Sequence, residues 1–86
     1  MINVALLGFG RIGQMHAQNI YLNKTLNLLY VYEKIDKLSK KAKNLYNCKI
    51  EKNYKKIFKD EKVDIIFISS PTNTHIRFIE EGIKYN

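Results

Sequence analysis

The stretch 4-VALLGFGRIGQMH-16 decides the fold, because an apolar run ends in three closely spaced glycines and a helical pattern follows at once. Residues 2–7 (INVALL) have the length and composition of a parallel strand that is buried on both faces. Residues 11–22 then carry apolar side chains at helical spacing. The stretch therefore predicts a strand, a glycine-rich turn and a helix. The side chains expected on the apolar face of this helix are Ile12, Met15 and Ile20.

The rest of the chain repeats this alternation of apolar runs and helical patterns. After the second strand, Asp36 is expected to cap a helix whose apolar face carries Leu38, Ala42 and Leu45. The lysines of this helix then fall on its solvent side. The further expected elements are strands at residues 27–32, 48–50 and 63–68 and helices at residues 36–45, 54–58 and 76–83.

Strands that are separated by helices cannot pair as hairpins, so each crossover returns parallel and right-handed. The fold class is therefore α/β, a doubly wound parallel sheet of the Rossmann type with four strands in the order 3-2-1-4. Ligands of such sheets bind beyond the carboxyl ends of the strands, where the strand order reverses. In this chain the crevice is flanked by the segments GFGRIG and SSPTNTH.

The three glycines stand between strand and helix, which is the context that a dinucleotide-binding loop requires. Gly8 permits the tight turn, Gly10 lets a pyrophosphate approach the backbone, and Gly13 lets the helix pack closely on the strands. Free N–H groups at the start of the helix then face the phosphates. The alternative is a tight turn without a ligand, with Arg11 simply exposed instead of paired with a phosphate. The candidate cofactor-binding residues of this loop are Gly8, Phe9, Gly10, Arg11, Ile12 and Gly13.

Glu33 ends the second strand, twenty residues after Gly13, where a carboxylate can accept hydrogen bonds from the ribose hydroxyls of adenosine. The alternative is a surface acid at a strand end. A carboxylate at this place repels a 2′-phosphate, so NAD is favoured over NADP as the cofactor, although Lys34 can soften that repulsion.

The segment SSPTNTH follows the last expected strand and brings hydroxyls, a stiff proline and a histidine to the same crevice. Thr72 can equally be only the N-cap of the last helix. The candidate residues on the nicotinamide side are Ser69, Ser70, Pro71, Thr72 and His75. His16 has no acid or metal partner at a suggestive spacing, and we interpret it as structural. Cys48 is interpreted as a buried apolar residue.

The composition is that of one small domain of 86 residues, with a net charge of +7. All but two of its lysines lie between Lys34 and Lys62, interleaved with acids, so we interpret them as solvated surface and not as a nucleic-acid site. A basic nucleic-acid-binding domain stays the less favoured alternative. The single cysteine suits a reducing compartment, and the N-terminal apolar run is too short for a signal peptide or a membrane span. We therefore expect a cytoplasmic protein.

Together these residues resemble the start of the glucose–fructose oxidoreductase / inositol dehydrogenase (Gfo/Idh/MocA) family. The similar segments are GFGRIGQMHAQNI at residues 8–20, the acid Glu33, and SSPTNTHIRFIEEGIKYN at residues 69–86. The inositol 2-dehydrogenase branch is the most similar in GRIGxxHAxNI and PTxxH. One departure is Thr72, because many members have asparagine after the proline.

The resemblance implies an NAD(P)-dependent oxidoreductase that acts on sugars, polyols and related hydroxy compounds. It also implies a second domain that binds substrate and mediates homo-oligomers, and a Glu-Lys-Pro segment whose lysine helps to activate the substrate. The chain ends at Asn86, before such a segment, so residues 1–86 are expected to be an incomplete N-terminal dinucleotide-binding domain that is inactive by itself. A non-catalytic dinucleotide-binding or sensing module is the alternative, since it would share every residue of this chain.

Overall fold

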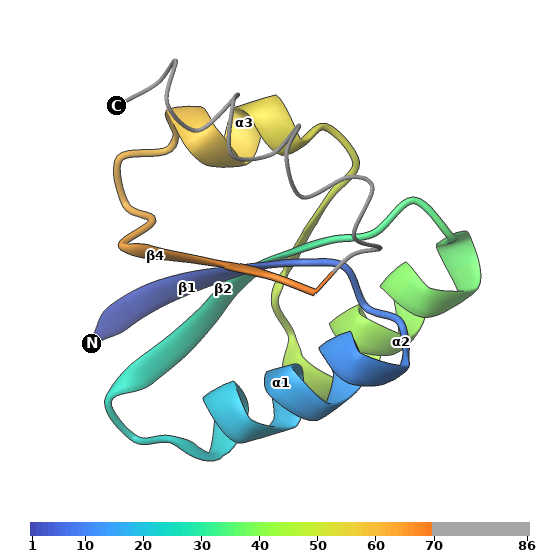
Figure 1. The fold of residues 1–86 in the computed structure, drawn as a ribbon, viewed down its shortest axis with the longest axis horizontal. Helices are drawn as coiled ribbons and strands as arrows, with labels where there is room; N and C mark the ends of the chain where they lie inside the picture. The colour runs from blue at the N-terminus through green and yellow to red at the C-terminus, as the bar shows by residue number, and fades with distance from the viewer. Residues whose placement is uncertain (70–86) are drawn as a thin grey trace.

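The computed structural model describes residues 1–69 and builds them into one parallel sheet covered by helices on both faces (Figure 1). The last expected helix, at residues 76–83, lies outside the described residues. The elements are β1 (Ile2–Leu7), α1 (Arg11–Leu22), β2 (Leu26–Tyr32), α2 (Asp36–Tyr46), β3 (Lys49–Glu51), α3 (Tyr54–Lys59) and β4 (Ile65–Ile68).

The strand order β3-β2-β1-β4 confirms the order expected from the sequence. Every strand pairing is parallel, and β1 pairs with both β2 and β4. The register between β1 and β2 shifts once, between Val4 and Ala5. Because the chain leaves β1 toward β2 and reaches β4 on the other side, the strand order reverses beside the carboxyl end of β1. The glycine-rich turn begins at that end.

Successive residues of β1 face opposite layers of the core, which explains why Val4, Ala5, Leu6 and Leu7 are all buried, whereas Ile2 at the start of the strand is exposed. Val4 and Leu6 pack with residues of α1 and α2 in one cluster, whereas Ala5 and Leu7 pack with Ile57 of α3 in the other. Figure 1 shows α1 and α2 on one side of the sheet and α3 on the opposite side.

The buried face of α1 differs from the expected one. Ile20 is buried as expected, but Ile12 is 55% exposed and Met15 is 59% exposed, and the helix instead buries Gly13 and Ala17. These two small residues share one face of the helix with Ile20, at spacings of four and three residues. Their size brings the helix backbone close to the sheet, so no large side chain is needed there.

The start and the outer face of α2 also differ from expectation. Ile35 is the N-cap, and Asp36 lies in the first turn, where it accepts a bond from Lys52 that lowers the pKa of the Asp36 carboxyl. Ala42 is buried, but Leu45 is 53% exposed. The lysines of α2 are exposed, as expected.

A hydrogen bond on the α3 face of the sheet links β2 to the end of α3. The Tyr30 hydroxyl donates to Asp60 Oδ2 at 2.6 Å, and this bond raises the pKa of Tyr30 to about 12. Because the folded pKa lies above the unfolded one, the stability that this bond supplies is complete below about pH 10 and is lost as the pH rises through about 12.

We therefore expect Tyr30→Phe to lower the melting temperature at about pH 9. We also expect the melting temperature of this variant to fall less between about pH 9 and about pH 11 than that of the unchanged protein. Thermal unfolding followed by circular dichroism at both values measures this. Tyr21→Phe is the control, because the Tyr21 hydroxyl has no hydrogen bond within residues 1–69. Equal pH dependence in the two variants would contradict the assignment.

Within residues 1–69, none of the helices has the length and apolarity needed to cross a membrane. The same residues contain no group of histidine, cysteine and acidic side chains arranged to hold a metal ion.

Candidate functional site

The site begins where β1 ends, with Gly8 in a backbone conformation that favours glycine. Its φ is 107°, and its N–H donates to the carbonyl of Tyr32 at 2.8 Å. The turn is thereby tied to the end of β2. A side chain at this φ would be strained, so Gly8 permits the abrupt change of direction between strand and helix.

Gly13 is glycine because α1 crosses the end of β1 with no room for a side chain. A Cβ built on Gly13 would lie 2.2 Å from the carbonyl oxygen of Gly8 and 2.9 Å from Ser69 Oγ. The first of these neighbours is backbone, so it cannot move aside easily. Gly13 therefore sets how closely α1 packs on the sheet.

Gly10 presents the opposite case, since nothing in the described chain requires a glycine there. Its φ of −73° and ψ of −163° are open to other residues, and a Cβ built on it would meet no atom within 4 Å. Gly10 is the exposed N-cap of α1, and no side chain caps this end of the helix within residues 1–69. The bare helix start, with its free N–H groups and positive dipole end, is a cradle for an anion.

Phe9 anchors the turn in the hydrophobic core. Its ring is fully buried and meets Tyr46 of α2 edge-on, with the ring centroids 6.3 Å apart. The residue as a whole is buried, so Phe9 supports the turn and presents no exposed surface to a ligand. Its N–H donates to Glu33 Oε1 at 2.9 Å.

Glu33 connects two segments of the site through one carboxylate. While Oε1 accepts from Phe9, Oε2 accepts from the N–H of Ile35 at 3.0 Å, at the start of α2. Each carboxylate oxygen can accept a further bond, so these contacts leave acceptor capacity for a ribose hydroxyl. Glu33 thus lies beside the glycine-rich turn, where the adenosine ribose of a bound dinucleotide would lie next to the phosphates.

Glu33→Gln is expected to weaken the binding of adenine dinucleotides by about tenfold, because an amide can accept only one of the two N–H bonds and no longer carries charge. Isothermal titration with NADH measures the loss. Glu51→Gln is the control, since Glu51 also accepts backbone N–H bonds, but at the start of α3. Equal affinities of the Glu33→Gln variant and the unchanged protein would exclude Glu33 from the site.

Ser69 joins the end of β4 to the turn. Its N–H donates to the carbonyl of Leu7 at 2.9 Å, and its hydroxyl donates to the carbonyl of Gly8 at 2.9 Å. Ser69 therefore lies beside Gly8 and Gly13, on the β4 side of the crevice. The other candidates of this segment, Ser70, Pro71, Thr72 and His75, lie outside the described residues.

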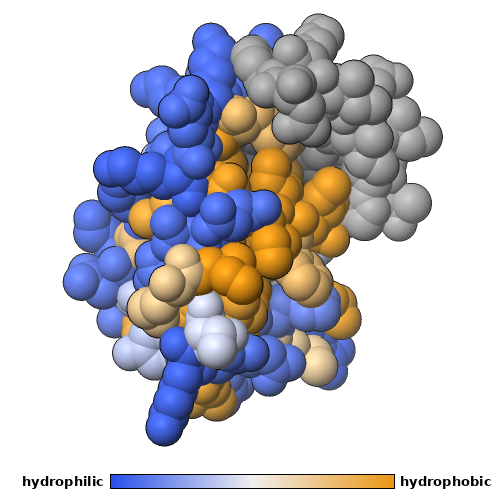
Figure 2. Space-filling view, turned by 90° about the vertical axis from the view of Figure 1, so that its left-hand side faces the viewer, coloured by the Kyte–Doolittle hydropathy of each residue, from blue (hydrophilic) through white to orange (hydrophobic). Residues whose placement is uncertain are grey.

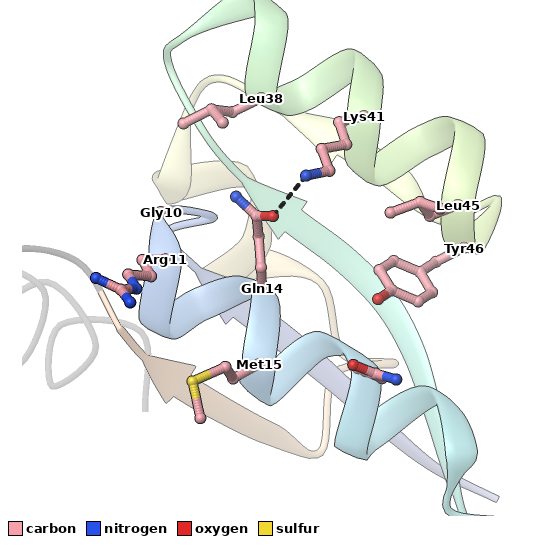
Figure 3. Close-up of a pocket in the computed structure, with 9 residues that line it drawn as sticks. Gly10, Arg11, Gln14, Met15, Leu38, Lys41, Leu45 and Tyr46 are labelled. Carbon is pink, nitrogen blue, oxygen red and sulfur yellow. Dashed lines mark hydrogen bonds between the residues drawn. The ribbon is translucent and has the colours of Figure 1, made fainter.

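The remaining candidates of the turn, Arg11 and Ile12, occupy the first turn of α1 and are exposed. Figure 3 shows the Arg11 side chain pointing away from α2 at the start of the helix. Near Glu33, Lys52 donates to the carbonyl of Lys34 at 3.1 Å, which places a second cation beside the turn between β2 and α2. The local charge around Glu33 is therefore mixed.

Gln14 supports the site and was not among the residues expected from the sequence. Its side-chain amide donates to the carbonyl of Phe9 at 3.3 Å, and its amide oxygen accepts from Lys41 of α2 at 2.8 Å. The sequence signal for this role was the position of Gln14 four residues after Gly10. Residues at this spacing lie on the same face of a helix, so Gln14 faces the turn.

His16 and Cys48 have the structural roles expected of them. His16 packs on Phe67 of β4, with ring centroids 5.0 Å apart. Cys48 is buried, and this burial raises the pKa of its thiol.

A parallel sheet with reversed strand order, a glycine-rich turn into a bare helix start and an acid at the end of the neighbouring strand define a Rossmann-type dinucleotide-binding domain. Residues 2–86 match the model of the Gfo/Idh/MocA oxidoreductase family, NAD-binding Rossmann fold. The chain belongs to this family.

The chain is similar to several characterised and uncharacterised relatives. It is 30% identical over 84 residues, which is 96% of the chain, to the uncharacterized oxidoreductase YrbE of Bacillus subtilis. It is 29% identical over 80 residues, 91% of the chain, to the myo-inositol 2-dehydrogenase of Thermotoga maritima. These matches span 25% and 24% of the two relatives, so the chain corresponds to about a quarter of their length.

Solved structures agree with the fold. A myo-inositol dehydrogenase from Corynebacterium glutamicum superimposes with a TM-score of 0.87 at 28% identity, over 98% of this chain and 25% of that one. The scyllo-inositol dehydrogenase of Lactobacillus casei has a TM-score of 0.89 at 23% identity, over 99% of this chain and 26% of that one.

Proposed function

We propose that the protein binds NAD across the GFGRIG turn and transfers hydride between this cofactor and a hydroxyl of a sugar or polyol such as an inositol. The observation that carries the proposal is Gly10. Its backbone and surroundings accept a side chain, so nothing within the described chain requires a glycine at this position. A pyrophosphate that approaches the backbone closely would require the absence of a Cβ. Membership of an NAD-binding oxidoreductase family and the similarity to inositol 2-dehydrogenases support the substrate class.

In this proposal the following candidate residues have binding roles. Gly10 and the N–H groups at the start of α1 hold the pyrophosphate, Arg11 adds a cation beside it, and Glu33 accepts from the ribose hydroxyls. Ser69 and the segment with Ser70, Pro71, Thr72 and His75 line the nicotinamide side. When bound, NAD would supply the hydride acceptor, so that an alcohol could be oxidised to a carbonyl while its hydroxyl proton passed to a base.

The proposed cofactor is NAD and not NADP, because the Glu33 carboxylate would repel a 2′-phosphate. Lys34 and Lys52 reduce this repulsion, so the preference is expected to be moderate. Parallel calorimetric titrations with NADH and NADPH test it. Tighter binding of NADPH would overturn the role given to Glu33.

The catalytic proposal is tested by following NADH formation at 340 nm with NAD⁺ and a panel of inositols and sugars. Turnover of at least one polyol by the complete protein is expected. Binding of NADH without turnover of any member would favour a non-catalytic dinucleotide-binding module.

We further propose that residues 1–86 are the N-terminal dinucleotide-binding domain and that the substrate-binding residues belong to a further domain. An enzyme and a non-catalytic module would then share the cofactor site and differ in that further domain. A homo-oligomer is proposed for the complete protein, and light scattering coupled to size-exclusion chromatography tests it.

A further inference from the structure

A groove of about 570 Å³ runs between α1 and α2, on the outer surface of the helical layer. Gly10, Arg11, Gln14, Met15 and Gln18 of the first helix and Leu38, Lys41, Leu45 and Tyr46 of the second line it (Figure 3). Only the end of the groove at Gly10 and Arg11 adjoins the proposed dinucleotide site. The rest of the groove has no part in the proposed cofactor binding.

The groove exposes large apolar side chains without a partner in the described chain. Leu45 is 53% exposed and Met15 is 59% exposed, although both are residue types usually found inside. Figure 3 shows Leu45 and Tyr46 reaching from α2 toward α1. Exposed apolar surface with a polar rim is typical of a docking site for another protein. Figure 2, which views another side of the molecule, shows that apolar surface (orange) is also present elsewhere, so exposure by itself does not single out the groove.

The charge around the groove sets it apart. None of its lining residues is acidic, and Lys41 crosses it to bond Gln14 at 2.8 Å. The helix α1 carries no acid, and the single acid of α2, Asp36, is already bonded to Lys52. The charged residues that line the groove are Arg11 and Lys41, both basic, and the other lysines of α2 lie outside its lining. An apolar groove with basic lining residues and no acidic one is complementary to an acidic amphipathic partner.

The shape of the groove indicates the form of that partner. The lining runs from Gly10 to Gln18 along α1 and from Leu38 to Tyr46 along α2, so the groove is on the order of 12 Å long, which corresponds to about two turns of a bound helix. A helix that lies in an apolar groove is a recurrent mode of peptide recognition, with anchors at positions i, i+3 or i+4, and i+7.

We propose that the α1–α2 groove docks an acidic amphipathic helix of a partner protein. Its leucine-type anchors lie against Leu38, Leu45 and Tyr46, and its carboxylates face Lys41. The interaction uses the part of the groove beyond Gly10 and Arg11.

A fluorescein-labelled synthetic peptide of about 14 residues, with leucines at i, i+4 and i+7 and glutamates elsewhere, is the probe. Fluorescence anisotropy is expected to show saturable binding to the protein that weakens with salt. Lys41→Glu is expected to weaken binding by about tenfold or more, and the matched Lys43→Glu by less than about twofold, because Lys43 is on the same helix but does not line the groove. Leu45→Ser, which keeps every charge, is expected to weaken binding by about fivefold. All three side chains are exposed, and circular dichroism checks that the variants fold.

Three results would overturn the proposal. The first is no binding of the acidic peptide at low salt. The second is an equal loss in Lys41→Glu and Lys43→Glu, which would indicate attraction to the net charge alone. The third is equal binding of a peptide with lysines in place of the glutamates. Displacement of the peptide by single-stranded RNA, with the same sensitivity to both lysine variants, would assign the basic surface to nucleic acid instead and would likewise overturn it.

Discussion

Replacing Gly13 by alanine is expected to lower the free energy of unfolding by about 3 kcal/mol or more. The new Cβ would lie 2.2 Å from the carbonyl oxygen of Gly8. Gly8 is itself held in place, because its N–H donates to the carbonyl of Tyr32. Relief requires α1 to move away from β1, which opens the cluster that Ala17 and Ile20 form with the sheet. A domain of this size has little stability to spare, so the variant is expected to be largely unfolded.

Urea denaturation followed by circular dichroism measures this effect. Ala17→Gly is the control, since it also changes a buried small residue of α1 but adds no atom, and helix propensity predicts a loss of only about 1 kcal/mol. A Gly13→Ala variant as stable as the unchanged protein would show that α1 does not lie as close to β1 as the structure has it.

Replacing Gly10 by alanine is expected to have the reverse outcome, with the fold kept and the cofactor lost. The backbone conformation admits alanine and the Cβ meets no atom within 4 Å. Alanine is a poorer N-cap than glycine but costs less chain entropy on folding, so stability is expected to change by less than about 1 kcal/mol. The methyl group would instead stand where the pyrophosphate approaches the backbone, and affinity for NADH is expected to fall by about tenfold or more.

Calorimetric titration with NADH, with circular dichroism of the same sample, measures both halves of this prediction. Gln18→Ala is a suitable control, because Gln18 lies on the same helix, outside the proposed cofactor contacts. Unchanged affinity in Gly10→Ala would mean that no ligand approaches this backbone, and the glycine-rich segment would then be only a turn.

The strand order could be predicted from the sequence because alternating apolar runs and helical patterns allow few arrangements of a parallel sheet. The buried face of α1 could not, since helical periodicity indicates the large apolar side chains of Ile12 and Met15, whereas close packing on the sheet selects Gly13 and Ala17. The exposure of Leu45 was missed for a related reason. Periodicity shows which residues share a face, but not how far the neighbouring helix extends over that face.

The location of Glu33 could be predicted, but the bonds of its carboxylate could not. The spacing between the glycines and Glu33 placed the carboxylate at the end of β2, where the structure has it. That this carboxylate also holds the N–H groups of Phe9 and Ile35 depends on how two loops approach each other, which no spacing along the chain encodes. The brace from Gln14 to Lys41 likewise arises only once α1 and α2 lie side by side.

The most direct test of the central claim, that the GFGRIG turn holds the phosphates of NAD, is the two-dimensional ¹H–¹⁵N NMR spectrum of the protein during titration with NADH. The largest amide shifts are expected at residues 9–13 and 33–35, with little change at the opposite end of the sheet, for example at Thr25 and Asp64, which lie beside the amino-terminal ends of β2 and β4. The account is contradicted if NADH leaves residues 9–13 unshifted, or if the largest changes occur at that opposite end.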